Sequence, residues 1–360
     1  MNSSHIVILC SRLDMPGGTE RAVVHTASLL QSRGHRVSLL VLDETAESFY
    51  TVSDNIELVQ LPLHFGVTVK GNVVTRKMAL LGHVRRLKAE LDRMQPTLIL
   101  STDYVFTIAA WMACGRKGVR IAAWEHHHFH WLKKSRFWNY LFHRIYPKLD
   151  AVICLNRTEA ALYAQLGCTT KVIPNFISRH QAVPQAPVLL TIGWLIKRKG
   201  IDLIPSIAEK VFSKHPEWKW RITGEGKEKE WLKKEIRNRN LQNHITIVPP
   251  STQEVQELYK DASLYIMTSR FECFPLVLLE AMSCGLPCVA FDCPTGPADI
   301  IRHGVDGLLV PNEDIEAMST AIIQLIDNEE RRNTMSVEAY DGIDRFSPEK
   351  VYALWKEYIG

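Results

Sequence analysis

The sequence predicts an α/β protein made of two doubly wound, parallel-sheet domains that face a central cleft. Short apolar segments of strand length alternate with segments of helical periodicity along most of its 360 residues, which is the pattern of parallel sheets covered by helices. A proline-bearing segment at 178–187, SRHQAVPQAP, is poor in large apolar residues. We place the domain boundary there and expect domains at 1–180 and 188–346. Several strands end in glycine-rich or polar loops, and such sheets bind ligands at the carboxyl ends of their strands.

The composition is that of an ordinary globular protein, with 46% hydrophobic and 23% charged residues. A net charge of +4 is too small to indicate nucleic acid as the main partner. No apolar run reaches the roughly 18 residues of a transmembrane helix. The first residues, MNSSHIVILCSRLDM, lack a basic leader, so they predict a buried strand rather than a signal peptide. We therefore expect a cytoplasmic protein.

The eight cysteines form no CxxC pair. Several fall in predicted strands or on an apolar helix face, which indicates reduced thiols in the core and agrees with a cytosolic compartment. Cys284, Cys288 and Cys293 have no matching histidine cluster nearby. A structural zinc site is therefore not expected.

In the first domain the alternation predicts six strands with helices between them. The strands are expected at 6–10, 37–42, 56–61, 97–101, 119–124 and 151–155, and the helices at 19–33, 76–93, 106–114 and 157–166. Thr19 can cap the first helix, and the Gly17-Gly18 turn before it forms a phosphate-facing loop. A GxGxxG dinucleotide fingerprint is absent. In the second helix the spacing predicts one apolar face, formed by Met78, Leu81, Val84 and Leu87.

A run of histidines, EHHHFH at 125–130, follows the strand at 119–124. Adjacent residues of an extended segment point to opposite sides, so the run does not form a converging set of metal ligands. A single histidine at the carboxyl end of a strand, facing a ligand crevice, fits the pattern better. We select His126 for that role.

The segment at 131–148, WLKKSRFWNYLFHRIYPK, combines aromatic residues with basic ones. Its basic residues are Lys133, Lys134, Arg136, Arg144 and Lys148. A helix of this kind can lie on an anionic membrane surface. It can equally be a core helix with a solvated basic face. The sequence leaves both alternatives open.

The second domain repeats the alternation. Its strands are expected at 188–192, 218–223, 245–248, 263–267, 288–291 and 308–310, and its helices at 201–214, 227–238, 253–260, 276–282 and 315–326. The loops at 193–200, 224–226, 248–251 and 271–277 follow strands and should meet at one edge of the sheet. A last, aromatic-rich helix at 348–358 should dock on the rest of the protein.

The segment at 271–285, FECFPLVLLEAMSCG, places Glu272 and Glu280 on either side of a helix start. Pro275 suits the first helical position, and Gly285 ends the helix. The free N–H groups around 274–277 form an anion site. Carboxylates repel a phosphate but accept hydrogen bonds from hydroxyls, so the pair suits a diphosphate flanked by two polyols, which is a nucleotide sugar. The alternative is that Glu272 pairs with the helix dipole and Glu280 is a solvated helix residue.

These motifs together resemble the retaining glycosyltransferases of family 4, whose GT-B fold has two Rossmann-like domains. Glu272 and Glu280 match the E-x7-E signature of that family in ECFPLVLLE. The surrounding LLEAMSCGLPCVAFDCPTGP, HGVDGLLVPNED and DRFSPEKVYALW are similar to the bacterial exopolysaccharide and lipopolysaccharide branch typified by amylovoran enzymes. The resemblance covers nearly the whole chain and is strongest from Val188 onward.

The resemblance implies a role for each matching residue. Glu272 would hold the hydroxyls of the donor sugar, and Glu280 would accept from the ribose hydroxyls. The diphosphate would be bound by Lys199 and by the backbone of Gly18, Phe274, Leu276 and Val277. His126 would lie near the sugar, and the helix at 347–360 would cross back onto the first domain. At the strand ends, the further donor-binding residues are Gly193, Arg198, Glu225 and Val248.

The implied activity is transfer of a hexose or N-acetylhexosamine, preferably from a UDP-sugar, to a lipid-linked or polysaccharide acceptor. Fixed cations and a helix N-terminus can stabilise the leaving diphosphate without metal, and no DxD-type motif follows a strand, so no cofactor or metal is expected. Trp194 stands where the family usually has arginine, and Cys273 stands where glycine is usual. Lys197 or Arg198 can compensate for the missing cation. Trp194 motivates the alternative of a non-catalytic nucleotide-sugar binder, whereas the E-x7-E spacing argues against a nucleotide-sugar epimerase.

Overall fold

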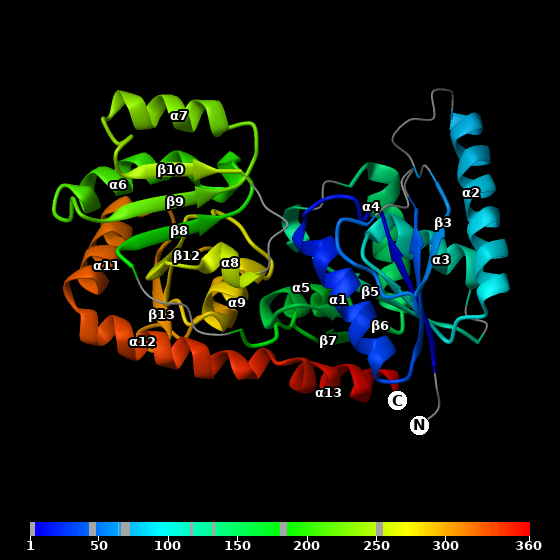
Figure 1. Cartoon of the computed structure of the whole chain (residues 1–360). Coiled ribbons are helices and arrows are strands. Elements are labelled where there is room, and N and C mark those ends of the chain that lie inside the picture. Colours follow the sequence, from blue (N-terminus) through cyan, green and yellow to red (C-terminus); the bar gives the residue numbers. More distant parts are fainter. Residues whose placement is uncertain are drawn as a thin grey trace. The chain divides into compact units, whose positions relative to one another are not determined.

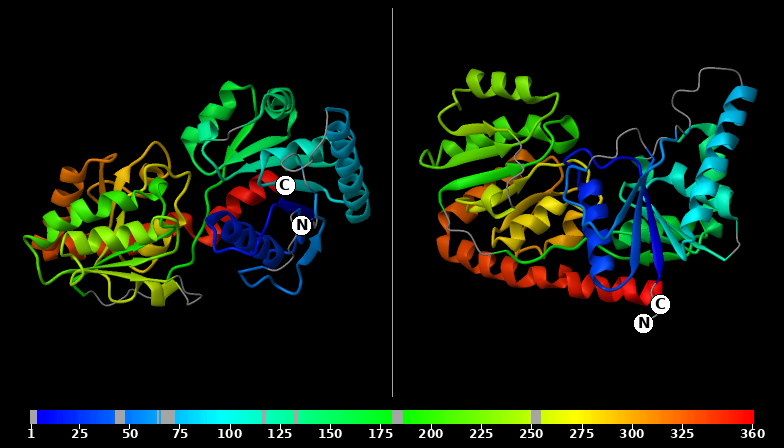
Figure 2. Two further views of the ribbon diagram at one scale, coloured as in Figure 1. Left: turned by 90° about the horizontal axis from the view of Figure 1, so that it is seen from above. Right: turned by 45° about the vertical axis from the view of Figure 1, so that its right-hand side comes forward.

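The structure, a computed structural model, describes residues 4–42, 48–63, 65, 73–115, 118–131, 134–180, 186–249 and 255–360, with the backbone alone at 73–77 and 255–256. The chain forms two compact units, which are described separately. The first comprises residues 1–174 and 352–360, and the second comprises 175–351. In each unit a parallel sheet carries helices on both faces (Figures 1 and 2).

The sheet of the first unit has seven strands in the order β3-β2-β1-β4-β5-β6-β7. These are β1 (His5–Cys10), β2 (Arg36–Val41), β3 (Glu57–Gln60), β4 (Leu98–Ser101), β5 (Arg120–Glu125), β6 (Ala151–Cys154) and β7 (Thr170–Val172). All residues of β1, β4 and β6 are buried, as expected for strands covered on both faces. The sequence did not predict β7, because its three residues are partly exposed and carry no apolar run.

The helices of the first unit are α1 (Gly18–Ser32), α2 (Val73–Met94), α3 (Tyr104–Cys114), α4 (Arg136–Ile145) and α5 (Arg157–Gln165). α2, α3, α4 and α5 contribute to one apolar core against the sheet. Side-chain caps fix three of their starts: Asp103 accepts from the Val105 N–H at 2.7 Å, Ser135 from the Trp138 N–H at 3.5 Å, and Asn156 from the Glu159 N–H at 2.8 Å.

Two helix predictions in this unit are wrong in part. In α2, Val84 and Leu87 are buried, but Met78 and Leu81 are exposed. Four residues at i, i+3 spacing drift around a helix of 3.6 residues per turn, so they cannot all face one side. The segment at 131–148 is not one helix either. A short 3-10 turn covers Phe129–Trp131, and α4 begins after Ser135, whose side chain caps it.

The sheet of the second unit has six strands in the order β10-β9-β8-β11-β12-β13. They are β8 (Val188–Ile192), β9 (Lys219–Thr223), β10 (Ile245–Val248), β11 (Leu264–Met267), β12 (Cys288–Asp292) and β13 (Gly307–Pro311). The helices are α6 (Ile204–Phe212), α7 (Lys229–Asn238), α8 (Val255–Tyr259), α9 (Leu276–Ser283), α10 (Pro297–Ile300), α11 (Ile315–Asp327) and α12 (Glu329–Gly342). The sequence missed α12, because only three of its residues are buried and its apolar periodicity is weak.

The boundary between the units lies at residues 174 and 175, before the proline-bearing segment in which we expected it. The reason is that the extended residues after 174 pair with the second unit. The Ile177 N–H donates to the Phe346 carbonyl at 3.0 Å, and the His180 N–H donates to the Ser283 carbonyl at 3.1 Å. Residues 181–185 of the expected linker lie outside the described residues.

The last helix, α13 (Pro348–Ile359), begins in the second unit and ends in the first. Within the first unit, Trp355 packs edge-on against Trp124 with ring centroids 5.5 Å apart. The Arg120 guanidinium donates to the carbonyls of Tyr358 and Ile359 at 2.9 and 2.6 Å. These contacts satisfy carbonyl groups at the end of the helix, which have no partner within it.

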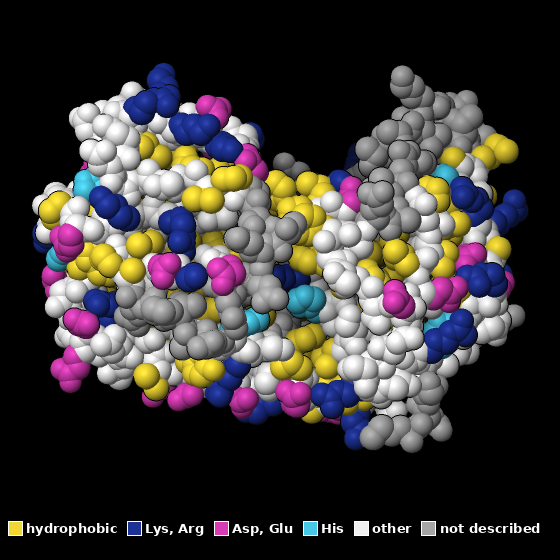
Figure 3. Space-filling model, viewed as in Figure 1, with side chains coloured by type: hydrophobic (Ala, Val, Ile, Leu, Met, Phe, Trp, Pro, Cys, Tyr) yellow, Lys and Arg dark blue, Asp and Glu magenta, His cyan; other side chains and the backbone are white. Residues whose placement is uncertain are grey.

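All eight cysteines are free thiols, and all but Cys114 are buried. Among the residues that the structure describes, no helix is both long and apolar enough to cross a bilayer, and no group of His, Cys, Asp or Glu side chains is arranged to hold a metal ion. On the face shown in Figure 3, basic and acidic side chains are interspersed rather than gathered into a basic stripe.

Candidate active site

Lys199 lies in a loop at the carboxyl end of β8 that is held tightly against β11. The short 3-10 turn Lys197–Lys199 ends at Gly200, which has φ +66°. A Cβ at Gly200 would lie 1.8 Å from the Thr268 carbonyl oxygen, so only glycine fits there. The Thr268 hydroxyl donates to the Lys199 carbonyl at 2.9 Å. The backbone that carries Lys199 is thereby fixed to the end of the neighbouring strand.

Glu272, which is buried, and Lys199, which is partly buried, form an ion pair. The Lys199 Nζ lies 2.6 Å from Glu272 Oε1, and the two side chains are 19% and 8% exposed. The loop that carries Glu272 is supported from β12, because the Thr295 hydroxyl donates to the Glu272 carbonyl. Gly296, with φ +96°, lies so close that a Cβ would be 2.9 Å from the Cys273 carbonyl oxygen. The pair joins residues 73 positions apart in the sequence.

The helix that carries Glu280 begins at the expected residue, but Pro275 is not its first helical residue. α9 starts at Leu276, and Pro275 is the extended residue before it. The N–H groups of Leu276 and Val277 lie in the first turn of α9, where an intrahelical acceptor is lacking. The helix ends at Gly285 as predicted: Gly285 has φ +77°, and its N–H donates to the Met282 carbonyl at 2.9 Å. Phe274 is buried and packs edge-on against Phe346.

Glu280 is not a solvated helix residue, so that alternative is wrong. Its side chain is buried, and its Oε2 accepts from the Tyr259 hydroxyl at 2.9 Å. The same hydroxyl lies 3.1 Å from the Val277 carbonyl oxygen. Tyr259 is itself fully buried, so it fixes the rotamer of the Glu280 carboxylate.

The remaining candidates of the second unit gather at the same edge of the sheet. A Cβ at Gly224 would lie 1.9 Å from the Gly193 carbonyl oxygen, which shows how closely these two loops pack. The Gly224 N–H donates to the Val248 carbonyl at 3.1 Å, and the Leu195 N–H donates to the Glu225 carbonyl at 2.8 Å. The Glu225 carboxylate pairs with Lys229 in the first turn of α7.

Lys197 and Arg198, the cations suggested to compensate for Trp194, differ from it in exposure. Trp194 is partly buried, whereas Lys197 and Arg198 are exposed. The carbonyl of Arg198 accepts from the Arg270 N–H at 2.9 Å. The suggested compensation by Lys197 or Arg198 stays a prediction.

In the first unit, Gly18 is the first residue of α1, and Gly17 precedes it in an extended conformation without a side-chain cap. The prediction that Thr19 caps this helix is therefore wrong. The Glu20 carboxylate folds over Gly17 so closely that a Cβ there would lie 1.9 Å from Oε2. Burial raises the pKa of Glu20. A carboxylate thus occupies the place beside the Gly17-Gly18 turn in which we expected a phosphate.

His126 lies immediately after β5 and is buried. Its ring packs against Trp124 with centroids 4.4 Å apart. Burial, with a smaller contribution from His127, lowers the pKa of His126 to about 3, so the imidazole is neutral near pH 7. Its Nε2 has no hydrogen-bond partner among the described residues.

Both halves of the chain match family models. Residues 172–342 match the model described as "Glycosyl transferases group 1", and residues 16–181 match the model described as "Glycosyltransferase Family 4". The chain belongs to the family 4 glycosyltransferases.

Relatives of this family 4 glycosyltransferase include bacterial enzymes of surface glycans. It is 26% identical over 347 residues to an uncharacterized glycosyltransferase of Haemophilus influenzae, covering 94% of this chain and 95% of that protein. It is 33% identical over 171 residues to the amylovoran biosynthesis glycosyltransferase AmsD of Erwinia amylovora, covering 48% and 47%. It is 26% identical over 283 residues to the lipopolysaccharide 1,6-galactosyltransferase of Escherichia coli, covering 75% and 76%. The alignment thus reaches nearly the full length of the first relative but about half of AmsD.

Solved structures confirm the predicted fold. A variant of TarM from S. aureus superposes with a TM-score of 0.81 at 16% identity, covering 98% of this chain and 99% of that chain. HepE of Anabaena gives a TM-score of 0.82 at 17% identity, with 99% of both chains covered. The two Rossmann-like units of this family 4 glycosyltransferase are those of the GT-B fold.

Sequence reasoning missed an acidic cluster at the carboxyl edge of the first sheet. Asp103, Glu125 and Glu159 follow or end β4, β5 and β6, and all are largely buried. Burial raises the pKa of Glu125 and of Glu159 to about 7 in each case. Glu125 accepts from the Tyr146 hydroxyl. The signal was present in the sequence for Asp103 and Glu125, which stand at strand ends, whereas Glu159 lies in the first turn of α5.

Glu159 also holds the histidine segment in place. Its Oε2 accepts from the Phe129 N–H at 2.9 Å, and its Oε1 lies 3.7 Å from His128 Nδ1. Lys134, which we considered part of a membrane-facing basic set, instead lies 4.0 Å from the centroid of the Phe142 ring. Burial lowers the pKa of Lys134. Lys133 lies outside the described residues.

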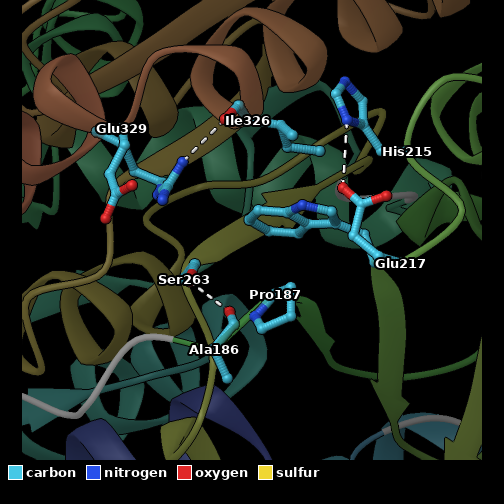
Figure 4. A pocket seen from close by; sticks show the side chains of 9 residues that line it. Ala186, Pro187, His215, Glu217, Ser263, Ile326 and Glu329 are labelled. Carbon is cyan, nitrogen blue, oxygen red and sulfur yellow. Dashed lines mark hydrogen bonds and ion pairs between the residues drawn. The ribbon is translucent and has the colours of Figure 1, made fainter.

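A pocket of about 450 Å³ lies at the opposite, amino-terminal edge of the second sheet (Figure 4). Polar side chains that line it already bind other groups of the protein. His215 pairs with Asp327 at 3.0 Å and with Glu217 at 3.4 Å, and Arg332 donates to the Leu325 and Ile326 carbonyls at the end of α11. None of the candidate residues lines this pocket, so the site is defined by the ion pair and not by this pocket.

Proposed function

We propose that this chain transfers a hexose or N-acetylhexosamine from a nucleotide sugar, preferably a UDP-sugar, to a lipid-linked or polysaccharide acceptor. The reaction retains the anomeric configuration and serves the synthesis of bacterial exopolysaccharide, O-antigen or lipopolysaccharide. The observation that carries the proposal is the partly buried Lys199–Glu272 pair at 2.6 Å, with Glu280 on the helix that follows Glu272. The names of AmsD and of the E. coli galactosyltransferase support the pathway class.

The reaction needs a group that stabilises charge on the leaving diphosphate. Lys199 Nζ would supply it, together with the N–H groups of Leu276 and Val277 at the start of α9. When the diphosphate binds Lys199, Glu272 Oε1 loses its ion-pair partner and becomes free to accept hydrogen bonds from sugar hydroxyls. Glu280, whose Oε2 accepts from Tyr259, would direct Oε1 to the ribose. These residues act without a metal ion.

UDP is the preferred nucleotide in this proposal because TarM and HepE were both solved with UDP. Glu272 and Glu280 bind hydroxyls, which every nucleotide sugar carries. The base is therefore selected elsewhere, in the loops after β8 and β9 that pack closely around Gly193 and Gly224.

We propose further that α4 brings the protein to the cytoplasmic surface of an anionic membrane, where a lipid-linked acceptor would be found. Trp138, Phe142 and Ile145 face the core, which accounts for the core-helix alternative. On other sides of the segment, Trp131, Phe137 and Tyr140 are 46%, 47% and 60% exposed. Arg136 and Arg144 are also exposed. Exposed aromatic and basic residues together suit a lipid headgroup region.

Sedimentation with anionic vesicles tests the membrane proposal. We expect binding that weakens with added salt and with the pair Phe137→Ser and Tyr140→Ser. The matched control is Trp231→Ser, an exposed aromatic residue on α7, which should leave binding unchanged. Equal binding by all three proteins would contradict the assignment to α4.

Turnover of radiolabelled UDP-sugars with a lipid-linked acceptor tests the main proposal. Transfer to the acceptor with retained configuration supports it. Binding of UDP-sugar without transfer would instead support a non-catalytic nucleotide-sugar binder, an alternative motivated by the partly buried Trp194 in place of a cation. Absence of both binding and transfer would contradict both functions.

A further inference from the structure

Arg270 joins three loops at the carboxyl edge of the second sheet. It lies three residues after β11 and two before Glu272, and its side chain is 18% exposed. Its Nη1 and Nη2 donate to the two carboxylate oxygens of Asp202 at 2.7 and 2.9 Å. Its Nε donates to Glu313 Oε2 at 2.6 Å, and Nη1 also donates to the Lys197 carbonyl.

These contacts fasten both ends of the turn that carries Lys199. The carbonyls of Lys197 and Arg198 accept from the Arg270 side chain and backbone N–H, respectively. Asp202 follows the turn in the next 3-10 segment, Ile201–Leu203. The Thr268 hydroxyl also donates to the Lys199 carbonyl. Each residue of the turn Lys197–Lys199 therefore accepts a hydrogen bond from the loop that leads to Glu272.

We propose that Arg270 is a positioning residue that holds the turn at 197–200 so that Lys199 Nζ meets Glu272 and the donor diphosphate. This inference rests on the proposed function. Arg270 does not replace the cation missing at Trp194, because two carboxylates and a carbonyl already engage four of its five N–H donors. The arrangement requires arginine, since only a planar guanidinium presents donors in several fixed directions at once.

The expected consequence of losing Arg270 is misplacement of Lys199 rather than loss of a ligand. A shift of about 1 Å in a catalytic group can cost on the order of 100-fold in rate. Arg270→Gln should therefore lower kcat by roughly 10- to 100-fold and weaken UDP binding by roughly 10-fold. Arg270→Lys should not restore either quantity, because an ammonium group cannot bridge Asp202, Glu313 and the Lys197 carbonyl.

Arg239 provides a matched control in the same unit. It also binds two carboxylates, Glu209 at 2.6 Å and Glu235 at 3.2 Å, but these contacts link α7 to α6 and involve none of the described residues of the site loops. Arg239→Gln should lower the melting temperature and leave kcat, KM and the UDP affinity within about twofold of the wild type. A role of Arg270 in stability alone would give the same result as this control.

The test is a double-mutant cycle between Arg270→Gln and Lys199→Ala on the full chain, with kcat from sugar transfer and UDP affinity from calorimetry. If Arg270 acts through Lys199, Arg270→Gln should cost less than about twofold in the Lys199→Ala background. Should Arg270→Gln not fold, Glu313→Gln removes one of the same contacts and should give a smaller loss of kcat in the same direction.

Equal loss of activity in both backgrounds, or wild-type activity in Arg270→Gln, would overturn the inference and leave the proposed function standing. A wild-type chain that neither binds UDP nor transfers sugar would overturn the proposed function, and this inference with it.

Discussion

At the carboxyl edges of the two sheets, ionisable side chains lie in different environments. In the second unit, charged side chains are paired: Lys199 with Glu272 at 2.6 Å, and Arg270 with Asp202 at 2.7 Å. In the first unit, Glu125 and Glu159 are buried, and burial raises the pKa of each to about 7. Burial also keeps His126 neutral near pH 7 by lowering its pKa to about 3.

One fold can therefore provide two kinds of site. An edge of paired charges has fixed cations and carboxylates to exchange for those of an anionic ligand, as the proposed donor site requires. An edge of buried acids and a neutral imidazole favours uncharged forms, which suits an acceptor that presents hydroxyl groups.

The largest effect is expected from removing the Glu272 carboxylate of the Lys199–Glu272 pair. Glu272→Ala should lower kcat by about 100- to 1000-fold, because it removes the proposed contact to the reacting sugar. Initial rates of UDP-sugar transfer measure this. Glu316→Ala, which removes a 75% exposed carboxylate on α11, is the control. Near-normal activity of Glu272→Ala in a folded protein would refute the role of Glu272.

The second largest effect is expected in the pH dependence of the free energy of unfolding, through Glu125 of the first unit. The pKa of Glu125 rises from 4.5 to about 7 on folding. Between these values the folded state keeps a proton that the unfolded state has lost, so stability is full below pH 4.5 and falls as the pH rises to about 7. At about 1.4 kcal/mol per pH unit, the loss is about 3 kcal/mol.

Calorimetric melting of the full chain from pH 5 to 8 checks this. Glu125→Gln keeps an acceptor for the Tyr146 hydroxyl but cannot titrate, so its melting temperature should fall less steeply with rising pH than that of the wild type. Parallel curves for the two proteins would show that Glu125 does not titrate in this range.

A smaller effect is expected from the hydroxyl that orients Glu280. Tyr259→Phe removes a hydrogen bond of 2.9 Å within a buried site, worth about 1 kcal/mol. The donor KM should rise by about fivefold, with kcat little changed, because the ribose contact is the same in the ground state and the transition state. Steady-state kinetics with varied UDP-sugar measure both constants. A change in kcat with an unchanged KM would place Glu280 in the chemical step instead.

The smallest effect is expected at Trp194. Trp194→Arg adds a cation at the carboxyl end of β8, where the family usually has one, and should strengthen UDP binding by about two- to fivefold. Calorimetric titration with UDP measures the affinity. Unchanged or weaker binding would show that the side chain at 194 does not reach the diphosphate.

Much of this site could be predicted from the sequence, because its parts follow strands. The loops with Gly193, Lys199, Glu225 and Glu272 were found from the alternation of apolar strands and helices, and Glu280 from its spacing to Glu272. Backbone position at the end of a parallel strand is a local property, so a local pattern reveals it.

The partners of these residues could not be predicted in the same way. The pairing of Lys199 with Glu272 joins positions 73 apart, and that of Arg270 with Asp202 joins positions 68 apart. Such contacts depend on which loops pack together and on side-chain rotamers. The exposed Met78 and Leu81 show a similar limit, because an i, i+3 pattern was mistaken for one helix face.

The central claim is that the paired edge of the second unit binds the nucleotide diphosphate. Hydrogen exchange of the full chain with and without UDP tests it most directly. We expect slower exchange at 193–200, 224–228 and 271–280, and no change at 103–107, 125–131 or 156–160. Protection confined to the segments of the first unit, or no protection at all, would contradict the claim.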